Sequence, residues 1–323
     1  MSTRTVPLPT SMQAIRIARF GGPEVMELVS IPVPRPGDGE LLVRIGAASL
    51  NPVDWKIREG KYPAVGEDRL PYVMGRDFSG EVAALGGGVA GFAEGDLVYG
   101  LLDIARGSFA DYAIVRPGEV ARRPAKLDAV KAAAVPLAAL TAWQGLFRHG
   151  QLQPGQRVLI HAGSGGVGHF AVQFAHVHGA RVVSTASTEH VDFVRSLGAD
   201  EVIDYKHEKF EQRVSDIDLV YDLIGGETRE RSWQVLRRGG TLVSTLDEPS
   251  QDKAKEFGVR ALRYTAESSA SDLGEITALI DAGKVRPTVS EISPLRDARS
   301  ALQALEGGHM AGKALLLMDV ADR

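Results

Sequence analysis

A glycine-rich turn between an apolar strand pattern and a helix pattern constrains the fold of this chain most. Residues 158–168 have the sequence Val-Leu-Ile-His-Ala-Gly-Ser-Gly-Gly-Val-Gly, and Gly166 to His178 is then predicted to be an amphipathic helix that stops at Gly179. A G-x-G-x-x-G spacing is weak by itself, but between a strand and a helix it predicts a dinucleotide-binding turn. The alternative is a glycine turn that binds no ligand.

Each glycine of this turn has a separate expected role. Gly163 would allow the tight turn, Gly165 would let the backbone approach a pyrophosphate, and Gly168 would let the helix pack closely on the strand. The helix N-terminus offers unpaired N–H groups to the phosphates. We therefore expect the cofactor to contact the backbone of this turn, at Gly163, Ser164, Gly165, Gly166 and Val167.

Composition narrows the class of protein. A chain of 323 residues suits two domains, and a net charge of −4 with both signs mixed gives no reason to expect nucleic acid or an acidic membrane as partner. The absence of cysteine excludes disulfides, thiolate catalysis and cysteine-ligated zinc or iron–sulfur sites. No apolar run approaches the roughly 18 residues of a membrane span, and Met1–Ser11 lacks a signal-peptide core. We expect a cytoplasmic protein that acts on a small molecule.

Strand and helix patterns divide the chain into two parts. Between about residues 130 and 285 they alternate, which predicts a doubly wound parallel sheet with helices on both faces. The first 125 residues carry short strand patterns broken by Gly, Pro and Asp, which predicts an irregular antiparallel β domain. A last strand is predicted at Lys313–Val320. The predicted strands of the parallel sheet are 157–161, 181–185, 201–204, 219–223, 241–246 and 260–264, and those of the first part include 40–45, 79–84 and 97–99.

The tip of the second parallel strand indicates which nicotinamide cofactor fits. NAD-binding folds usually place an acidic residue there, whereas this chain has Thr185-Ala186-Ser187-Thr188. A small polar tip leaves room for a 2′-phosphate and favours NADPH over NADH, although no Arg or Lys stands at the tip itself. Ser187, Thr188, His190 and Tyr205 are the candidate contacts. The alternative makes Ser187 a helix N-cap and Tyr205 a half-buried residue at the sheet end.

Seven blocks in order resemble one family, the zinc-independent quinone oxidoreductases and enone reductases of the medium-chain dehydrogenase/reductase superfamily. The blocks are residues 51–56, 75–82, 95–100, 137–143, the glycine turn, 196–200 and Gly312-Lys313. The resemblance implies a GroES-like catalytic domain over residues 1–125 that is completed by 287–323, and a Rossmann NADP-binding domain over 126–286. It also implies an active-site cleft between the domains and a homodimer.

The same resemblance bears on metal and chemistry. Alcohol dehydrogenases of the superfamily bind catalytic zinc through cysteines and a Gly-His-Glu block, where this chain has Gly75-Arg76-Asp77. We therefore expect no metal, and we expect His161 to be packed and hydrogen-bonded rather than a ligand. Without a Lewis acid, reduction of a quinone or of a carbon–carbon double bond conjugated to a carbonyl is favoured over alcohol oxidation.

Lys56, Asn51 and Asp54 are the candidate catalytic residues. Lys56 would stabilise the developing negative charge of the acceptor or donate a proton; alternatively it is a surface lysine paired with Asp54 or Glu59. Asn51 would bind the substrate or the nicotinamide ribose, or only organise the turn before Pro52. Asp54 would orient Lys56.

Four further residues are expected near the cofactor from the resemblance. Thr141 would face the nicotinamide, or its hydroxyl would bond a backbone carbonyl one turn back. Leu246 would present strand-end backbone to the carboxamide, and Gly312 and Lys313 would lie beside the cofactor. The sequence thus predicts an NADPH-dependent quinone or enone reductase. A trans-acting acyl-carrier enoyl reductase and a non-catalytic NADPH-binding module remain alternatives.

Overall fold

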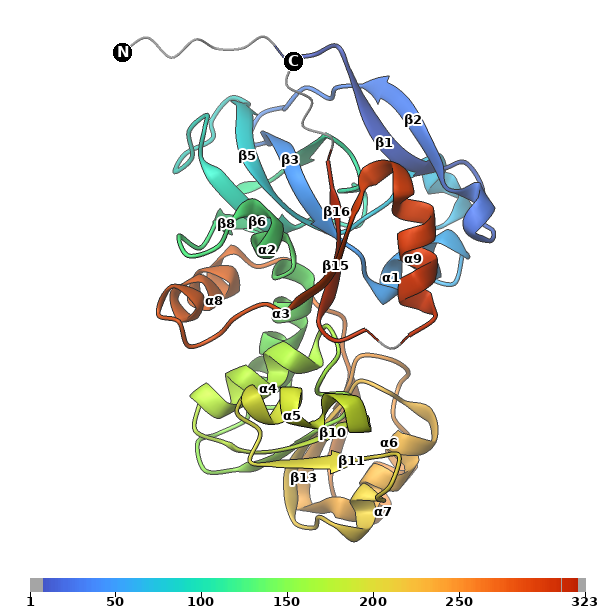
Figure 1. Cartoon of the computed structure of the whole chain (residues 1–323), viewed down its shortest axis with the longest axis vertical. Coiled ribbons are helices and arrows are strands. Elements are labelled where there is room, and N and C mark those ends of the chain that lie inside the picture. Colours follow the sequence, from blue (N-terminus) through green and yellow to red (C-terminus); the bar gives the residue numbers. More distant parts are fainter. Residues whose placement is uncertain (1–7, 309, 319–323) are drawn as a thin grey trace.

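A computed structural model describes residues 8–308 and 310–318. It has two lobes, a first lobe built on mainly antiparallel sheets and a second lobe built on a parallel sheet (Figure 1). The mixed α/β class and the two-part organisation predicted from the sequence are confirmed.

The lower lobe in Figure 1 contains a six-stranded parallel sheet in the order β11-β10-β9-β12-β13-β14. Neighbouring strands pair in parallel throughout, as the alternating pattern predicts. The order reverses between β9 and β12, and ligands of such sheets bind beyond the carboxyl ends of the strands at that reversal. The strands are β9 (Arg157–Ile160), β10 (Arg181–Ala186), β11 (Glu201–Asp204), β12 (Ile217–Asp222), β13 (Leu236–Ser244) and β14 (Arg260–Arg263).

All six predicted strands of this sheet exist, but β13 begins five residues before its predicted start at Thr241. Leu236 pairs with Ile217 of β12, and the register then shifts before the pairing resumes at Thr241. Arg237–Gly239 are exposed in this irregular stretch, so they carry no apolar signal. The helix after the glycine turn, α4 (Gly168–Val177), begins two residues later than predicted because Gly166 and Val167 still belong to the turn.

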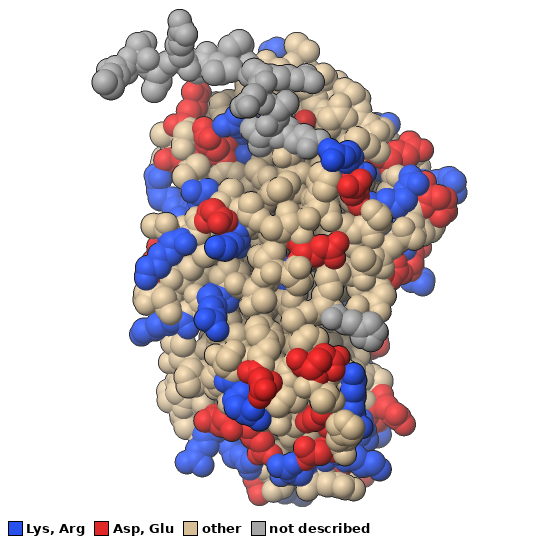
Figure 2. All heavy atoms as spheres, viewed as in Figure 1, with Lys and Arg blue, Asp and Glu red and all other residues tan. Residues whose placement is uncertain are grey.

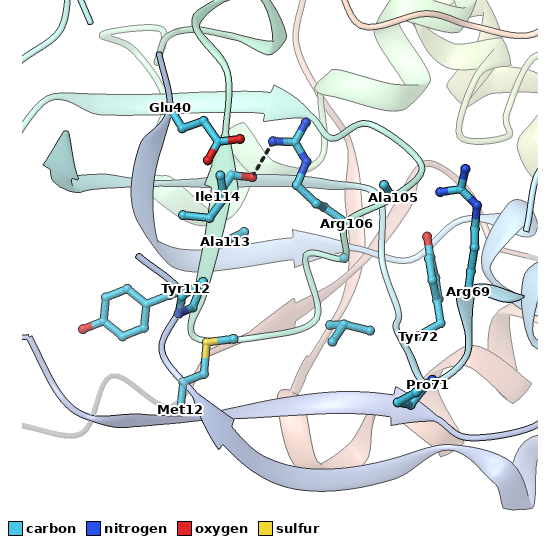
Figure 3. Close-up of a pocket in the computed structure, with 13 residues that line it drawn as sticks. Met12, Glu40, Arg69, Pro71, Tyr72, Ala105, Arg106, Tyr112, Ala113 and Ile114 are labelled. Carbon is cyan, nitrogen blue, oxygen red and sulfur yellow. Dashed lines mark hydrogen bonds between the residues drawn. The ribbon is translucent and has the colours of Figure 1, made fainter. Parts of the chain in front are cut away.

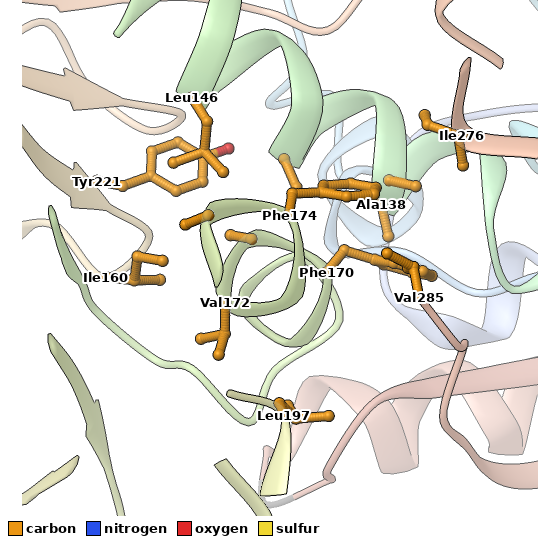
Figure 4. Close-up of a cluster of buried hydrophobic side chains, with 14 of the residues drawn as sticks. Ala138, Leu146, Ile160, Phe170, Val172, Phe174, Leu197, Tyr221, Ile276 and Val285 are labelled. Atoms are coloured by element: carbon orange, nitrogen blue, oxygen red, sulfur yellow. The ribbon is translucent and has the colours of Figure 1, made fainter. Parts of the chain in front are cut away.

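Helix α4 lies in the centre of the hydrophobic core of the lobe that contains the parallel sheet. Its residues from Gly168 to Ala175 are all buried. Figure 4 shows Phe170 and Phe174 of α4 packed among side chains from three other elements. These are Ala138 from α3 (Pro136–Trp143), Tyr221 from β12 and Ile276 from α8 (Ala270–Asp281). Helix α3 starts at Pro136 as predicted, and a π-helical segment, Gln144–His149, continues it. The remaining helices of this lobe are α5 (Val191–Ser196), α6 (Gly226–Ser232) and α7 (Gln251–Phe257).

The first lobe combines a seven-stranded sheet with a three-stranded sheet. The larger one has the order β15-β16-β3-β5-β6-β8, with β7 also paired to β3, and the smaller one has the order β2-β1-β4. Strands β3, β5 and β6 match the three predicted patterns of the first part, while β1 and β2 were not predicted. The strands are β1 (Ser11–Ile17), β2 (Glu27–Pro32), β3 (Leu41–Ser49), β4 (Tyr72–Val73), β5 (Asp77–Leu85), β6 (Leu97–Leu101), β7 (Tyr112–Val115) and β8 (Val120–Arg122).

The C-terminal segment returns to the first lobe. Strand β16 (Lys313–Leu317) pairs antiparallel with β3 and parallel with β15 (Val289–Pro294). The predicted last strand therefore exists, although its residues 319 and 320 lie outside the described residues. Helix α9 (Ala298–Glu306) packs on α1 (Pro52–Arg58), and α2 (Ala129–Ala133) packs on β3 and β5. We keep the division at 125/126 and 286/287 as a proposal.

Candidate active site

The glycine turn begins where β9 ends and leads directly into α4. Ala162 takes the left-handed conformation with φ 56°, whereas Gly163 does not have a positive φ. A Cβ on Gly163 would lie 2.1 Å from Ser184 Oγ on β10. The expected turn-forming role of Gly163 is therefore wrong: Ala162 makes the turn, and Gly163 lets the turn pack on the neighbouring strand. A Cβ on Gly168 would lie 2.0 Å from the carbonyl oxygen of Ala162, as close helix packing predicts.

Gly165 is constrained differently from its neighbours. A Cβ there would meet only Ala162 O, at 3.4 Å, so the protein's own packing does not require glycine at this position. Residues 164–167 are half-buried at the carboxyl end of β9 and the N-terminal side of α4. A bare backbone with donors at a helix start fits the pyrophosphate of a dinucleotide.

The C-terminal segment is hydrogen-bonded to this turn. The Gly312 N–H donates to Ser164 O at 2.8 Å, and Gly312 itself needs its positive φ of 75° and its missing side chain beside Thr288 O. Lys313 is buried, and its Nζ donates to Leu50 O at 3.0 Å and to Asn51 Oδ1. Burial lowers the pKa of Lys313, and the charges of Asp77 and Asp54 oppose that shift.

A cavity of about 120 Å³ lies where these segments meet. It is lined in part by Leu50, which precedes α1, by Pro52, the first residue of α1, and by Gly166, Gly312 and Lys313. The structure thus brings three of the predicted cofactor residues next to the segment that holds Asn51.

Asn51 precedes α1 and is fully engaged inside the protein. Its Nδ2 donates to Asp77 Oδ1 at 2.9 Å and to Ser49 O at 3.0 Å, while its Oδ1 accepts from Lys313. Its backbone N–H donates to Asp54 Oδ2 at 2.7 Å and so fixes the first turn of α1. The side chain of Asn51 therefore joins three segments of the chain.

Asp54 and Lys56 do not contact each other in the described part of the chain. Asp54 is completely buried, and its Oδ1 makes no hydrogen bond to any described residue. Burial raises the pKa of Asp54 to about 7. Lys56 is half-buried and forms no ion pair with a described residue, and Glu59 pairs instead with Arg58 and Lys61. Lys56 is therefore not a surface lysine paired with Asp54 or Glu59.

Thr141 lies on α3, and its hydroxyl donates to Leu137 O at 2.6 Å. This is the hydrogen bond to a backbone carbonyl one turn back that was predicted as the alternative to facing the nicotinamide. Its carbonyl oxygen accepts from the hydroxyls of Tyr221, at 2.9 Å, and Tyr264. Leu246 lies two residues beyond β13, where its carbonyl oxygen accepts from Arg263 Nε at 2.7 Å. Contact of Thr141 and Leu246 with the nicotinamide stays a prediction.

The residues predicted to contact the cofactor at the tip of β10 differ from their expected structural roles. Ser187 occupies the N-cap position of the short turn Thr188–His190, but its hydroxyl is hydrogen-bonded to His190 Nδ1 at 3.0 Å and caps no backbone N–H. Tyr205 is 58% exposed rather than half-buried. Asp204, the last residue of β11, pairs with Ala186 and so places a carboxylate beside the β10 tip. Hydrogen bonding by the Thr188 side chain lowers the pKa of Asp204.

Lys206 was missed in the sequence. Its Nζ pairs with Glu189 Oε2 at 3.0 Å beside the β10 tip. Because β11 pairs with β10 through Ala186 and Asp204, the end of β11 lies next to the tip. The known order of strands in a doubly wound sheet is the signal that would have found it.

The two buried histidines near the turn are structural. His161 makes hydrogen bonds to Thr185 Oγ1 at 3.2 Å and to Ser232 Oγ at 2.9 Å, which confirms its predicted packed state. His169 joins Gly165 O to the backbone N–H of Thr288. Burial lowers the pKa of each to about 4, so both are neutral at neutral pH.

A second cavity, of about 530 Å³, opens in the first lobe between the β1–β4 sheet and β7 (Figure 3). Arg69, Tyr72, Arg106, Glu40 and Tyr112 are among its lining residues. None of the predicted site residues lines it.

Comparison with known proteins places the chain in a family. Residues 37–125 match the family model of the alcohol dehydrogenase GroES-like domain, and residues 197–316 match that of the zinc-binding dehydrogenases. A 2-methylene-furan-3-one reductase from Solanum lycopersicum is 35% identical, covering 98% of this chain and 81% of the relative. An NADPH-dependent alkenal/one oxidoreductase from Arabidopsis thaliana is also 35% identical, over 97% and 81%.

Solved structures give the same result. The quinone oxidoreductase from Coxiella burnetii superposes with a TM-score of 0.88 at 35% identity, covering 95% of this chain and 99% of that one. A GroES-like domain joined to a Rossmann-type domain defines a medium-chain dehydrogenase/reductase. Within that superfamily, the chain belongs to the quinone oxidoreductase family.

In the described part of the chain, no group of three or more His, Cys, Asp or Glu side chains could hold a metal ion. Arg76 occupies the block where zinc enzymes of the superfamily have a histidine, and it donates to Leu102 O at 2.9 Å.

Proposed function

We propose that this protein is an NADPH-dependent oxidoreductase that reduces quinones or α,β-unsaturated carbonyl compounds by hydride transfer, without a metal. The observation that carries the proposal is the contact between the glycine turn and the start of α1, made through Gly312 and Lys313. It brings the expected cofactor site beside the segment that carries Lys56. The relatives named for alkenal/one and quinone reduction support the same activity.

The backbone of residues 163–167 would hold the cofactor's pyrophosphate, and bound NADPH supplies the hydride. The chain's own residues then position the acceptor and stabilise charge. Lys56, half-buried and without an ion-pair partner among the described residues, would face the oxygen on which negative charge develops. Asp54, whose pKa is raised to about 7 by burial, can gain or lose a proton near neutral pH.

Lys206 supports NADPH as the preferred cofactor. Its side chain is 47% exposed at the tip of β10, where a cation can pair with a 2′-phosphate. Ser187, Thr188, His190 and Tyr205 surround the same tip and would contribute hydrogen bonds or stacking.

Location and assembly are part of the proposal. We infer a cytoplasmic homodimer, supported by the absence of cysteine and by the family resemblance. No described helix has the length and apolar character needed to cross a membrane. In Figure 2 both signs of charge are mixed over the lower lobe and the right side of the upper lobe, while Lys and Arg predominate along the left flank.

A panel assay tests the activity. NADPH oxidation is followed at 340 nm with a benzoquinone, a naphthoquinone, an alkenal and an enone, each with an enzyme-free control. We expect turnover with at least one class, and greater kcat/KM with NADPH than with NADH. Turnover of acyl-carrier-bound enoyl thioesters alone would favour the trans-acting enoyl reductase. Tight NADPH binding with no hydride transfer to any acceptor would favour the non-catalytic module.

A further inference from the structure

One buried carboxylate joins the candidate active-site segments. Asp77, the first residue of β5, is completely buried and accepts three hydrogen bonds. Ser49 Oγ donates to its Oδ1 at 2.7 Å, Asn51 Nδ2 to the same oxygen at 2.9 Å, and the Leu137 N–H to its Oδ2 at 2.9 Å.

These three donors come from separate parts of the site. Ser49 ends β3, and Asn51 is the N-cap of α1, the helix that carries Lys56. Leu137 lies in the first turn of α3, four residues before Thr141. Asp77 therefore holds α1 and α3 together across the boundary between the two lobes.

The network extends from Asp77 to the glycine turn. Asn51 accepts from Lys313, and the adjacent Gly312 donates to Ser164. The positive charge of Lys313 lies near enough to Asp77 to interact with it electrostatically. Loss of these donors would leave the buried carboxylate of Asp77 without partners, and an unpaired buried charge is costly.

We propose that Asp77 is a positioning residue, which fixes Asn51 and α3 so that the acceptor and the cofactor are correctly positioned relative to each other. The inference rests on the proposed reductase function. Asp77 does not touch the reacting atoms in this role; it acts through the Asn51 side chain and the α3 backbone. Small errors of position in an active site are known to cost large factors in rate.

The substitution Asp77→Asn tests the proposal. It keeps the side-chain shape but presents an amide that cannot accept from all three donors. Asp128→Asn is the matched control, because Asp128 caps α2 through the Lys131 N–H at 2.8 Å and shares no hydrogen bond with the described residues of the network. Four quantities are measured: kcat, the dissociation constant of NADPH by fluorescence, the deuterium isotope effect with 4-deuterated NADPH, and the melting temperature.

We expect Asp77→Asn to lower kcat about 30-fold, to enlarge the isotope effect, and to leave NADPH affinity within about threefold of wild type. Asp128→Asn keeps kcat and the isotope effect of wild type. A lower melting temperature with unchanged kcat and isotope effect would show a merely structural Asp77 and overturn the proposal.

If Asp77→Asn does not fold, Ser49→Ala tests the proposed role of Asp77 instead, because this substitution removes only one of the three hydrogen-bond donors to Asp77. A several-fold fall in kcat with unchanged NADPH affinity supports the role of Asp77, and unchanged kcat overturns it. Wild-type turnover is measured first, so that a wild type inactive with every acceptor overturns the proposed function and this inference with it.

Discussion

Lys313 donates a hydrogen bond to the side-chain oxygen of Asn51, although the two residues lie 262 positions apart in the sequence. The bond is buried and connects the returning C-terminal strand to the start of α1. It makes the cofactor turn and the candidate catalytic helix parts of one hydrogen-bonded unit.

Loss of this bond should destabilise the fold. Lys313→Met would leave Asn51 Oδ1 and Leu50 O without their donor, and we expect the free energy of unfolding to fall by about 1–3 kcal/mol. Urea unfolding measures the change. Lys255→Met, on the exposed side of α7, serves as control with an expected change below about 0.5 kcal/mol. Equal stability of Lys313→Met and wild type would contradict the prediction.

Lys56 should affect chemistry rather than folding. Lys56→Met removes the cation expected to stabilise the acceptor's developing charge, so kcat/KM for the best quinone or enone should fall about 10- to 100-fold. NADPH affinity should stay unchanged. Lys61→Met is the control, because Lys61 is exposed and pairs with Glu59. If both variants keep wild-type kcat/KM, Lys56 has no catalytic role.

Substitution by alanine at two glycines of the turn should change different properties, namely stability at Gly168 and NADPH affinity at Gly165. Gly168→Ala places a Cβ 2.0 Å from Ala162 O and should destabilise the protein by about 1–3 kcal/mol. Gly165→Ala meets only a 3.4 Å contact, so stability should change by less than about 0.5 kcal/mol while NADPH binds about tenfold more weakly. Thermal melting and NADPH fluorescence titration separate the two effects. Unimpaired NADPH binding by Gly165→Ala would argue against a pyrophosphate at this backbone.

Lys206 should contribute to the choice between NADPH and NADH. Lys206→Ala removes the cation at the β10 tip, and we expect the ratio of kcat/KM for NADPH to that for NADH to fall about fivefold. The effect should shrink as salt concentration rises, because the contact is exposed. Lys209→Ala tests for a general loss of positive charge in the same loop. An equal change in both variants would assign the effect to net charge alone.

Asp54 should make stability depend on pH. Its pKa is about 7 in the folded protein against an ordinary 3.8, so the folded state binds this proton more tightly than the unfolded state. The contribution of Asp54 to the free energy of unfolding therefore falls as pH rises from about 4 to about 7. Asp54→Asn should gain on wild type between pH 5 and pH 8, on the order of 2 kcal/mol. Parallel urea midpoints for the two proteins across this range would refute the assignment.

Prediction from sequence succeeded where a local pattern has one physical solution. The glycine turn, the following helix and the six parallel strands carry apolar periodicity and glycine stops, and the structure has all of them. The start of β13 was missed because residues 237–239 are exposed and leave no hydrophobic pattern. The role of Gly163 was misassigned because its constraint comes from Ser184 on another strand.

The site divides in the same way. The sequence by itself determined a dinucleotide fold, the absence of cysteine chemistry and the family, because these depend on residue types and on spacing within short segments. Only the tertiary structure decided that Lys313 holds Asn51, that Asp77 joins α1 to α3, and that Lys206 stands beside the β10 tip. These contacts join distant segments, and a hydrogen bond between such segments leaves no trace in local periodicity.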